Sequence, residues 1–477
     1  MYIEVVLPLA VPKTYTYAVP SELEDAVQTG VRAEVQFGRS KLYAALIVRI
    51  VDTPPDYKTK PITAILDAEP IVSSTQLQFW QWMATYYCCY LGEVMNAALP
   101  SGLRLGSETR VILAEAYQKK LLENPASIPG LSDDEFMVAE ALSVQNELTI
   151  ENIKDILDKK TVHGIIQGLI QKEVIVLKEE LQLKYKPKEI TMVQWREPYR
   201  SDPETIGSVL DKIPKNAEMQ TKVILTMISL GRNGAEVLQK DICEKTGAQP
   251  IVIQTLAKKG YFDIFKKVVS RTTTHDDDDL VLAAPMAPQQ VTCYTEITGL
   301  FTQKNVVLLH GVTGSGKTRV YTELIQKTIA EGKQVLYLLP EIALTAQIID
   351  RLQKFFGSEI ATYHSKLNNN ERVDMWKDVL AGKPIILSAR SGLFLPFRNL
   401  GLIIVDEEHD PSYKQFDPSP RYNARDAAIF LASLYKAKVL LGTATPSIES
   451  YFNAKSGKYG LTELNQRFGK AVLPEIR

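Results

Sequence analysis

Residues 311–318 read Gly-Val-Thr-Gly-Ser-Gly-Lys-Thr and fit the pattern G-x-x-x-x-G-K-[ST] at every fixed position. The apolar run 306–310 precedes this stretch, and a pattern with one apolar helical face follows it over 320–329. A strand, a glycine-rich turn and a helix are therefore predicted in that order, which is the context that this phosphate-binding motif requires. The alternative is a chance glycine-rich turn, and the flanking strand and helix argue against it.

This loop has the composition of a nucleotide-binding site. Its glycines let the backbone wrap closely around a phosphate, so that N–H groups and the helix N-terminus face the negative charge. We expect Lys317 to reach the β- and γ-phosphates of ATP and Thr318 to ligate Mg²⁺. The predicted ATP-binding residues of this segment are Gly311, Thr313, Gly314, Ser315, Gly316, Lys317, Thr318 and Arg319.

A second motif ends another apolar strand. Residues 402–409 read Leu-Ile-Ile-Val-Asp-Glu-Glu-His, which places Asp406 at the carboxyl edge of the sheet, where ligands of α/β folds bind. We predict that Asp406 holds the Mg²⁺ through water and that Glu407 orients or deprotonates the attacking water. An acidic strand end alone would be unremarkable. Together with the phosphate loop it predicts a catalytic set of Lys317, Asp406 and Glu407.

The last two hundred residues repeat a strand–loop–helix rhythm. Short apolar strands that alternate with helices indicate a parallel sheet covered on both faces. Thr443 and Thr445 follow the last of these strands, where their hydroxyls could sense the γ-phosphate; the alternative is a simple Gly/Pro turn. The predicted strands are 306–310, 334–339, 384–387, 402–405 and 438–441.

Composition limits the class of protein. The 477 residues predict about three domains, at roughly 150 residues per domain. The net charge of −1 excludes a uniformly basic nucleic-acid binder but leaves room for a local basic groove. No apolar stretch reaches the roughly 18 residues of a bilayer span, and no signal peptide is indicated, so we expect a cytoplasmic protein without a membrane partner. The four cysteines include no C-x-x-C pair, which supports neither a disulfide framework nor a zinc site.

The first two-thirds of the chain divide into a β-rich region and an internal repeat. Strand-like runs separated by turn signals occupy the first hundred residues and lead into one apolar helical face over 76–90. Segments 166–177 and 253–264 align with each other as helix, turn and strand, and two helical patterns precede each, which predicts two tandem winged helices. Such folds bind DNA or separate other domains, and neither third helix is strongly basic. The expected domains are 1–108, 109–203, 204–271, a linker over 272–285 and an ATP-binding lobe over 286–477.

The motifs together resemble helicase superfamily 2, and within it the PriA family of bacterial replication-restart helicases. The resemblance covers residues 1–110 and 286–477 well and the middle loosely. Its N-terminal part depends on 7–17, 37–38, 66–70 and 98–100. Its C-terminal part depends on Leu-Leu-Pro-Glu-Ile-Ala-Leu-Thr-Ala-Gln at 338–347, His364-Ser365, 389–394 and 406–415.

The resemblance implies a RecA-like motor lobe and a barrel-like N-terminal domain that captures the 3′ end of a nascent strand. In that domain it implies a pocket lined by Tyr15, Thr16, Tyr17, Gly38 and Lys60. The family often has an acidic residue where this chain has Thr16, and a hydroxyl bonds a terminal 3′-OH less strongly than a carboxylate does. The alternative for these tyrosines is a strand with outward aromatic residues.

Further residues take their expected roles from the same resemblance. Gln290 matches the glutamine that reads adenine, and His409 would couple DNA occupancy to Glu407. The aromatic-rich loop after the acidic box would stack on single-stranded bases and track their phosphates. The residues expected to bind DNA in the motor lobe are Arg390, Tyr413, Lys414 and Arg421.

The resemblance also sets expectations for the whole protein. It implies ATP and Mg²⁺ as ligands, zinc in the full-length family protein, and branched and single-stranded DNA, single-stranded DNA-binding protein and primosome proteins as partners. Because the chain ends where the first motor lobe should finish, we expect a truncated piece that hydrolyses little ATP. The alternatives are a non-catalytic fork-binding module and another superfamily 2 DNA translocase.

Overall fold

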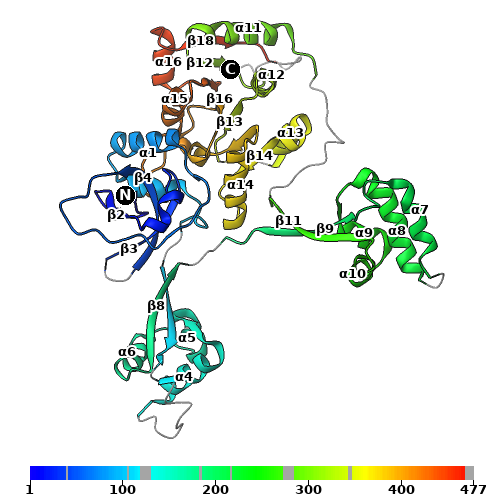
Figure 1. Cartoon of the computed structure of the whole chain (residues 1–477). Helices are drawn as coiled ribbons and strands as arrows, with labels where there is room; N and C mark the ends of the chain where they lie inside the picture. Colours follow the sequence, from blue (N-terminus) through cyan, green and yellow to red (C-terminus); the bar gives the residue numbers. More distant parts are fainter. Residues whose placement is uncertain are drawn as a thin grey trace. The chain divides into compact units, whose positions relative to one another are not determined.

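The computed structural model describes residues 1–38, 41–104, 107–115, 117–118, 130–181, 185–214, 217–271, 284–341 and 346–467 (Figure 1). The chain forms two compact units: one comprises 1–185 and 274–477, and the other 186–273. Most of the predicted linker, residues 272–283, lies outside the described residues, as do residues 342–345 of the 338–347 motif.

A seven-stranded, fully parallel sheet forms the centre of the ATP-binding lobe, as predicted. Successive residues of its strands point to opposite faces: Val306 and Leu308 belong to one hydrophobic core, and Val307 and Leu309 to the other. In spatial order the strands are β14 (Ile360–Tyr363), β15 (Ile385–Ser388), β13 (Gln334–Leu338), β16 (Leu400–Asp406), β17 (Lys438–Thr443), β12 (Val306–Gly311) and β18 (Gly460–Leu464).

Helices cover both faces of this sheet. One core contains apolar residues of α11 (Pro288–Gln303), α12 (Lys317–Ala330) and α13 (Ala346–Phe356). The other contains residues of α14 (Asn369–Ala381) and α15 (Ala424–Tyr435), whose first turns are capped by the side chains of Asn368 and Asn423. The short helix α16 (Ile448–Lys455) follows β17.

The N-terminal region is a five-stranded antiparallel sheet. The N–H of Ala18 donates to the carbonyl of Lys60 over 3.0 Å, and the N–H of Ile62 donates to the carbonyl of Ala18 over 3.0 Å. These bonds join the two ends of the sheet and give it the barrel-like form that we predicted. The strands, in spatial order, are β2 (Tyr15–Ala18), β1 (Tyr2–Val6), β4 (Lys41–Val51), β3 (Arg32–Phe37) and β5 (Ala64–Ile65).

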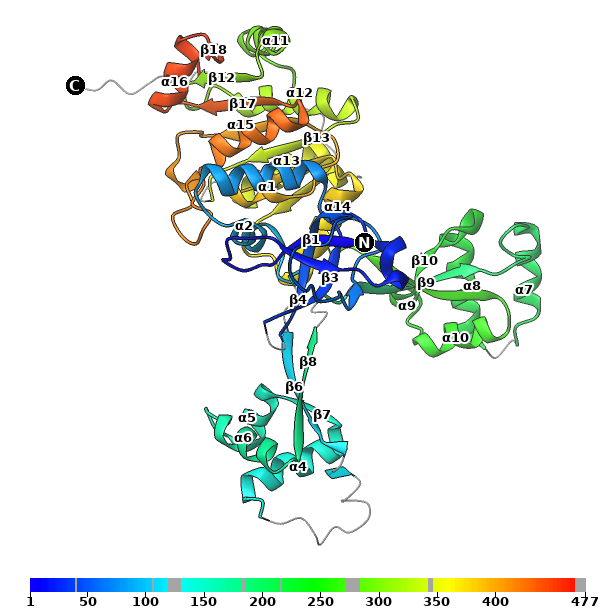
Figure 2. The same cartoon turned by 60° about the vertical axis from the view of Figure 1, so that its left-hand side comes forward.

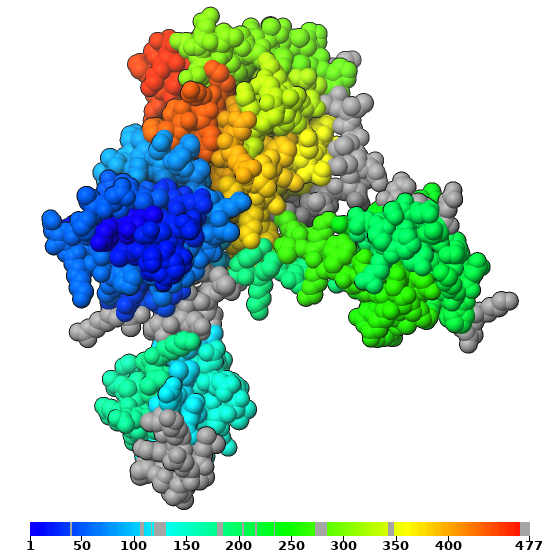
Figure 3. Space-filling view, viewed as in Figure 1, coloured from blue at the N-terminus to red at the C-terminus, as the bar shows by residue number. Residues whose placement is uncertain are grey.

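The helix predicted over 76–90 is found over Ser74–Tyr86, and a second helix that was not predicted follows it; both pack on the ATP-binding lobe. Helix α1 (Ser74–Tyr86) is followed by α2 (Leu91–Ala98), and both contribute to the core beneath α14 and α15. Figures 1 and 2 show α1 running alongside α15, and the rings of Trp82 and Phe430 stack there with centroids 4.0 Å apart. The space-filling view shows the blue N-terminal residues directly against the orange and yellow residues of the lobe (Figure 3).

The internal repeat predicted from the sequence is confirmed by the topology. Each copy runs strand, helix, strand, helix, helix, strand, with one additional short helix, α7 (Gly207–Asp211), after the first strand of the second copy. In each three-stranded sheet the first strand lies in the middle. The first copy has β6 (Ser107–Leu113), α4 (Asp133–Gln145), β7 (Glu147–Thr149), α5 (Ile150–Leu157), α6 (His163–Gln171) and β8 (Ile175–Leu181). The second has β9 (Lys188–Trp195), α8 (Glu218–Leu230), β10 (Val237–Leu238), α9 (Gln239–Thr246), α10 (Pro250–Lys258) and β11 (Phe262–Val269).

One expected boundary is wrong. We placed residues up to 203 in the first winged helix, yet β9 pairs with β10 and β11 and belongs to the second compact unit. The first strand of the second copy was assigned to the preceding domain because the sequence alignment covered only the last helix and strand of each copy.

Candidate active site

The phosphate-binding loop joins β12 to α12 as the motif requires. Gly314 and Gly316 have φ angles of +77° and +83°, a region that residues with a Cβ rarely adopt. Gly316 is the N-cap of α12, so the first N–H groups of the helix face the loop. The ammonium of Lys317 donates to the carbonyl of Gly311 over 2.9 Å. The lysine is therefore folded back over the loop.

Two features of the loop fit a phosphate group. The Ser315 hydroxyl is buried and has no hydrogen-bond partner among the described residues. A Cβ on Gly311 would lie 3.1 Å from that hydroxyl and 3.1 Å from Cγ of Lys317, so only glycine leaves this space open. An unsatisfied donor, a lysine and a helix N-terminus therefore surround one cradle, which matches the charge and the acceptor oxygens of a phosphate.

Asp406, at the end of β16, is held by tyrosines from three other elements. The Tyr321 hydroxyl of α12 donates to Oδ1 over 3.0 Å, and the Tyr337 hydroxyl of β13 donates to Oδ2 over 3.1 Å. The Tyr413 hydroxyl donates to the Asp406 carbonyl over 2.6 Å. Burial and, secondarily, the neighbouring Glu407 raise the pKa of Asp406 to about 6. A buried carboxylate with a raised pKa is one that a cation would stabilise in its charged form, which fits the predicted role in holding Mg²⁺.

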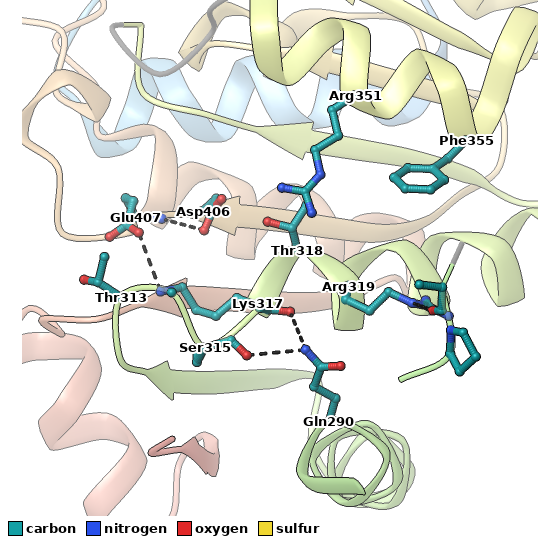
Figure 4. Close-up of a pocket in the computed structure, with 14 residues that line it drawn as sticks. Gln290, Thr313, Ser315, Lys317, Thr318, Arg319, Arg351, Phe355, Asp406 and Glu407 are labelled. Carbon is teal, nitrogen blue, oxygen red and sulfur yellow. Dashed lines mark hydrogen bonds and ion pairs between the residues drawn. The ribbon is translucent and has the colours of Figure 1, made fainter. Parts of the chain in front are cut away.

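Glu407 connects the two motifs. Its Oε1 lies 3.7 Å from Nζ of Lys317 (Figure 4), and its Oε2 lies 3.7 Å from Nδ1 of His409. Nδ1 of His409 in turn lies 2.7 Å from the hydroxyl of Thr443, and Nε2 lies 3.3 Å from that of Thr445. The structure thus brings the three residues predicted to couple the site into one hydrogen-bonded chain, while their coupling role stays a prediction.

Lys317, Asp406 and Glu407 line one cavity of about 500 Å³ at the carboxyl edge of the sheet (Figure 4). Thr313 and Thr318 line it, as predicted. Gln290 lines it too, but its amide is occupied: Nε2 lies 3.4 Å from the carbonyls of Ser315 and Gly316, and Oε1 accepts from the N–H of Ala287. Adenine reading by Gln290 therefore stays a prediction. Arg319 also lines the cavity, although its guanidinium is bonded to the carbonyl of Ala284 and to Glu323.

Several residues of this site were not predicted from the sequence. Arg351 and Phe355 of α13 line the cavity opposite the phosphate loop (Figure 4). Tyr321 and Tyr337 bind Asp406 from α12 and β13. The sequence signal was weak, because aromatic residues in a helix or a buried strand are usually explained by the core, and a single helical arginine by an exposed helix face.

The aromatic-rich loop differs from the prediction at Tyr413. Its side chain is 1% exposed, and its hydroxyl also donates to the carbonyl of Leu338 over 3.1 Å, so the ring cannot stack on a base. Phe416 is the aromatic residue of this loop that is open to solvent, with 71% of its surface exposed. Lys414 donates to the carbonyl of Arg421 and lies 5.6 Å from the ring centroid of Tyr87.

The two arginines predicted to bind DNA in this region both contact other residues of the protein. Arg390 donates to the carbonyl of Ser412 over 2.9 Å and lies 3.5 Å from Glu341. Arg421 is well exposed and lies 3.9 Å from Asp417. The Arg421–Asp417 pair is well exposed and therefore weak, whereas the Arg390 side chain is only 26% exposed. DNA binding by both arginines stays a prediction.

The predicted 3′-end pocket is only partly assembled. Lys60 donates to the carbonyl of Gly38 over 2.8 Å, and Tyr15 packs edge-on against Phe37. Tyr17, however, is 4% exposed, lies in the core of the barrel and donates to the carbonyl of Gln36, contrary to the base stacking that we expected. Thr16 lies between the tyrosines on the strand and therefore on the other face of the sheet.

Two features are absent from the described residues. Among them, no three or more His, Cys, Asp and Glu side chains are grouped so that they could hold a metal ion. None of their helices has the length and apolar character needed to cross a membrane.

Comparisons with known proteins match the N-terminal region and the ATP-binding lobe separately. A family model described as a 3′ DNA-binding domain (3′BD) matches residues 4–100, and one described as DEAD/DEAH box helicase matches residues 287–453. The replication restart protein PriA of Bacillus subtilis is 29% identical over 98% of this chain and 55% of that protein. PriA of Synechocystis is 33% identical over 97% of this chain and 54% of that protein. The chain thus spans about half the length of these relatives.

One solved structure is similar to part of the chain. It is the crystal structure of the DUF1998 helicase MrfA bound to DNA, and the match covers 38% of this chain and 27% of that one, at 19% identity and a TM-score of 0.29.

Proposed function

We propose that the chain is a member of the PriA family of replication restart proteins and that it acts in ATP-dependent 3′→5′ DNA unwinding. The substrate would be a stalled or branched replication fork, at which the protein initiates primosome assembly. The observation that carries the proposal is the approach of Lys317 and Glu407 to 3.7 Å at one cavity that Asp406 also lines. Two motifs that are 90 residues apart in sequence therefore meet where a nucleotide would be bound.

Each residue of the cavity would have its own role in phosphoryl transfer. Lys317 would exchange the Gly311 carbonyl for phosphate oxygens, and the loop N–H groups would hold the remaining charge. Glu407 would orient the attacking water and accept its proton, with His409 supporting the carboxylate. Thr318 and Asp406 would hold Mg²⁺, which neutralises charge on the transferred phosphate when it is bound. The tyrosine hydroxyls fix the Asp406 carboxylate in position before the ion binds.

For the DNA partner, we propose the free 3′ end of a nascent strand at the N-terminal domain. The match of residues 4–100 to a 3′ DNA-binding domain supports this assignment, and Lys60 beside Gly38 supplies a cation for a phosphate. Single-stranded DNA-binding protein and other primosome proteins are proposed as further partners from family membership alone.

Nucleotide binding by the purified chain tests the motor half of the proposal. Lys317→Ala should weaken binding of a fluorescent ATP analogue at least tenfold, because it removes the cation of the phosphate cradle. The matched control is Lys327→Ala, which removes an exposed lysine from the same helix and should leave the affinity unchanged. Equal affinities for all three proteins would contradict the assignment and favour the non-catalytic binding module.

Fork binding tests the DNA half. A fork with a free 3′-OH on its leading arm should bind more tightly than the same fork with a 3′-phosphate, as measured by fluorescence anisotropy. Another superfamily 2 translocase would bind both forks equally.

A further inference from the structure

Glu407 has a backbone conformation that a residue with a Cβ disfavours. Its φ angle is +48°, in the left-handed region. The N–H of Glu407 donates to Oδ1 of Asp406 over 3.1 Å, and its carbonyl accepts from the N–H of Asp410 over 2.9 Å (Figure 4). A residue stays in such a conformation only where the surrounding structure holds it there. The cause therefore lies in how its two neighbours, Asp406 and Glu408, are fixed.

Glu408 is anchored by a buried group of polar side chains. Its own side chain is 0% exposed. Its Oε1 accepts from the N–H of Ser447 over 2.7 Å, and its Oε2 accepts from the hydroxyls of Ser447 and Ser450 over 3.0 and 2.8 Å. Nη1 of Arg425 donates to the same Oε2 over 3.1 Å. The carboxylate is thus paired and hydrogen-bonded, as a buried charge must be. We call Arg425, Ser447 and Ser450 the Glu408 cage.

The Glu408 cage joins separate segments of the lobe. Arg425 lies in the first turn of α15, and Ser447 is the N-cap of α16, in whose first turn Ser450 lies. Nη1 of Arg425 also donates to the Ser447 hydroxyl over 2.7 Å, so the cage is bonded within itself. The N–H of Glu408 donates to the carbonyl of Gly442, near the end of β17, over 3.1 Å. Backbone and side chain of Glu408 are therefore both tied to the segment that joins β17 to α16.

Asp406, the other neighbour, is fixed as well. Tyrosine hydroxyls donate to its carboxylate and to its carbonyl. The chain turns at residue 407 between these two anchors, and the turn leaves Oε1 of Glu407 3.7 Å from Nζ of Lys317 (Figure 4). Asp406 and Glu407 line the nucleotide cavity, whereas Glu408 does not. Glu408 can therefore affect the cavity only through Glu407.

We propose that Glu408 is a positioning residue for Glu407. Its cage holds residue 407 in the left-handed conformation and so keeps the Glu407 carboxylate beside the phosphate loop. The alternative is a buried ion pair that stabilises the lobe without setting the position of its neighbour. The consequence for nucleotide binding rests on the proposed function, whereas the conformational part does not.

Glycine and alanine at position 407 test the conformational part without any ligand. Glycine adopts positive φ without a steric penalty, so Glu407→Gly should unfold about 2–4 °C above Glu407→Ala; at a residue with an ordinary φ, alanine gives the more stable protein. In a Glu408→Gln background this difference should fall by at least about half, because the anchor that imposes the turn is weakened.

A milder variant covers the case in which Glu408→Gln does not fold. Ser450→Ala removes one hydrogen bond of the Glu408 cage and keeps the ion pair, and it should reduce the same difference to a smaller extent. Equal unfolding temperatures for the glycine and alanine proteins would show that residue 407 is not strained. A difference that neither cage variant changes would show that Glu408 does not hold it. Either result overturns the proposal.

The ratio of ATP affinity to ADP affinity tests the position of the Glu407 carboxylate. A carboxylate beside the γ-phosphate repels ATP and not ADP, so Glu407→Gln should raise this ratio about threefold to tenfold. Glu408→Gln should raise it too, and should add nothing in the Glu407→Gln background. Lower stability alone would weaken both nucleotides alike and leave the ratio unchanged. The matched control is Glu449→Gln, the same change at an exposed position of α16, which should alter neither affinity.

Two outcomes separate this inference from the proposed function. If Glu407→Gln raises the ratio and Glu408→Gln does not, the proposed function stands and Glu408 is a structural residue only, which overturns the inference. If Glu407→Gln itself leaves the ratio unchanged, the proposed role of Glu407 has failed, and the inference fails with it.

Discussion

Tyr413 acts through its hydroxyl, whereas aromatic residues that bind DNA act through their ring faces. Both of its hydrogen bonds end on backbone carbonyls, at Leu338 on β13 and at Asp406 on β16, and these neighbouring strands carry the motor motifs. The residue thus fixes the start of the aromatic-rich loop to the sheet edge. Phe416, three residues further along, is the ring that solvent and DNA can reach.

Substitution separates the two roles. Tyr413→Phe should lower the free energy of unfolding by about 1–3 kcal/mol, because it leaves buried carbonyls unsatisfied. Phe416→Ala should change stability by less than about 0.5 kcal/mol and weaken single-stranded DNA binding by about 1–3 kcal/mol, the value of one stacked base. Urea unfolding and anisotropy measure the two quantities. A Tyr413→Phe protein of normal stability with weakened DNA binding would contradict this assignment.

At the scale of elements, β17 and α12 fit together only because residue 442 is a glycine. A Cβ at Gly442 would lie 1.8 Å from the Tyr321 hydroxyl, which donates to Asp406. Gly442→Ala should therefore displace Tyr321, destabilise the lobe by about 1–3 kcal/mol and weaken binding of the ATP analogue in the presence of Mg²⁺. Gly299→Ala is the control: no atom lies within 4 Å of its Cβ, and in the middle of α11 alanine should stabilise by about 1 kcal/mol. Two alanine variants of equal stability would rule out this steric account.

The residues around Asp406 show which parts of the site could be predicted from the sequence. The phosphate loop and the acidic box are contiguous stretches whose residue types dictate local geometry, so Lys317, Asp406 and Glu407 could be assigned and are found at one cavity. Tyr321 and Tyr337 reach Asp406 only through the register of neighbouring strands and the seating of α12, which no local pattern contains. Tyr413 and Tyr17 were misassigned for a related reason: tyrosines beside glycine and lysine resemble a stacking surface, while their burial depends on which side of a sheet or loop they occupy.

At the scale of the whole molecule, the segments that share a hydrophobic core differ from the segments that the two family models match. The 3′ DNA-binding model ends at residue 100 and the helicase model begins at residue 287, yet α1 shares a core with α14 and α15. Polar contacts connect the same parts: the Gln76 amide donates to the Phe394 carbonyl over 2.9 Å, and the Trp376 indole donates to the Ile71 carbonyl over 2.9 Å. Each winged-helix copy, in contrast, has a core of its own. Cooperativity follows shared cores, so the N-terminal domain should unfold with the ATP-binding lobe, and each of the two copies should unfold in a smaller transition of its own.

Differential scanning calorimetry of two variants tests this. Trp82→Ala removes the ring that stacks on Phe430 and should lower the midpoint of the largest transition, that of the ATP-binding lobe, while leaving the smaller transitions in place. Leu256→Ala empties a fully buried position of α10 and should destabilise the transition of 186–273 alone, by about 2–5 kcal/mol. Trp82 lies inside the segment that matches the DNA-binding model, so the decisive quantity is the shift in the transition of the ATP-binding lobe. A separate transition that moves with Trp82→Ala while that of the lobe stays unchanged would mean that the N-terminal domain folds alone, and that α1 is docked on the lobe without sharing its stability.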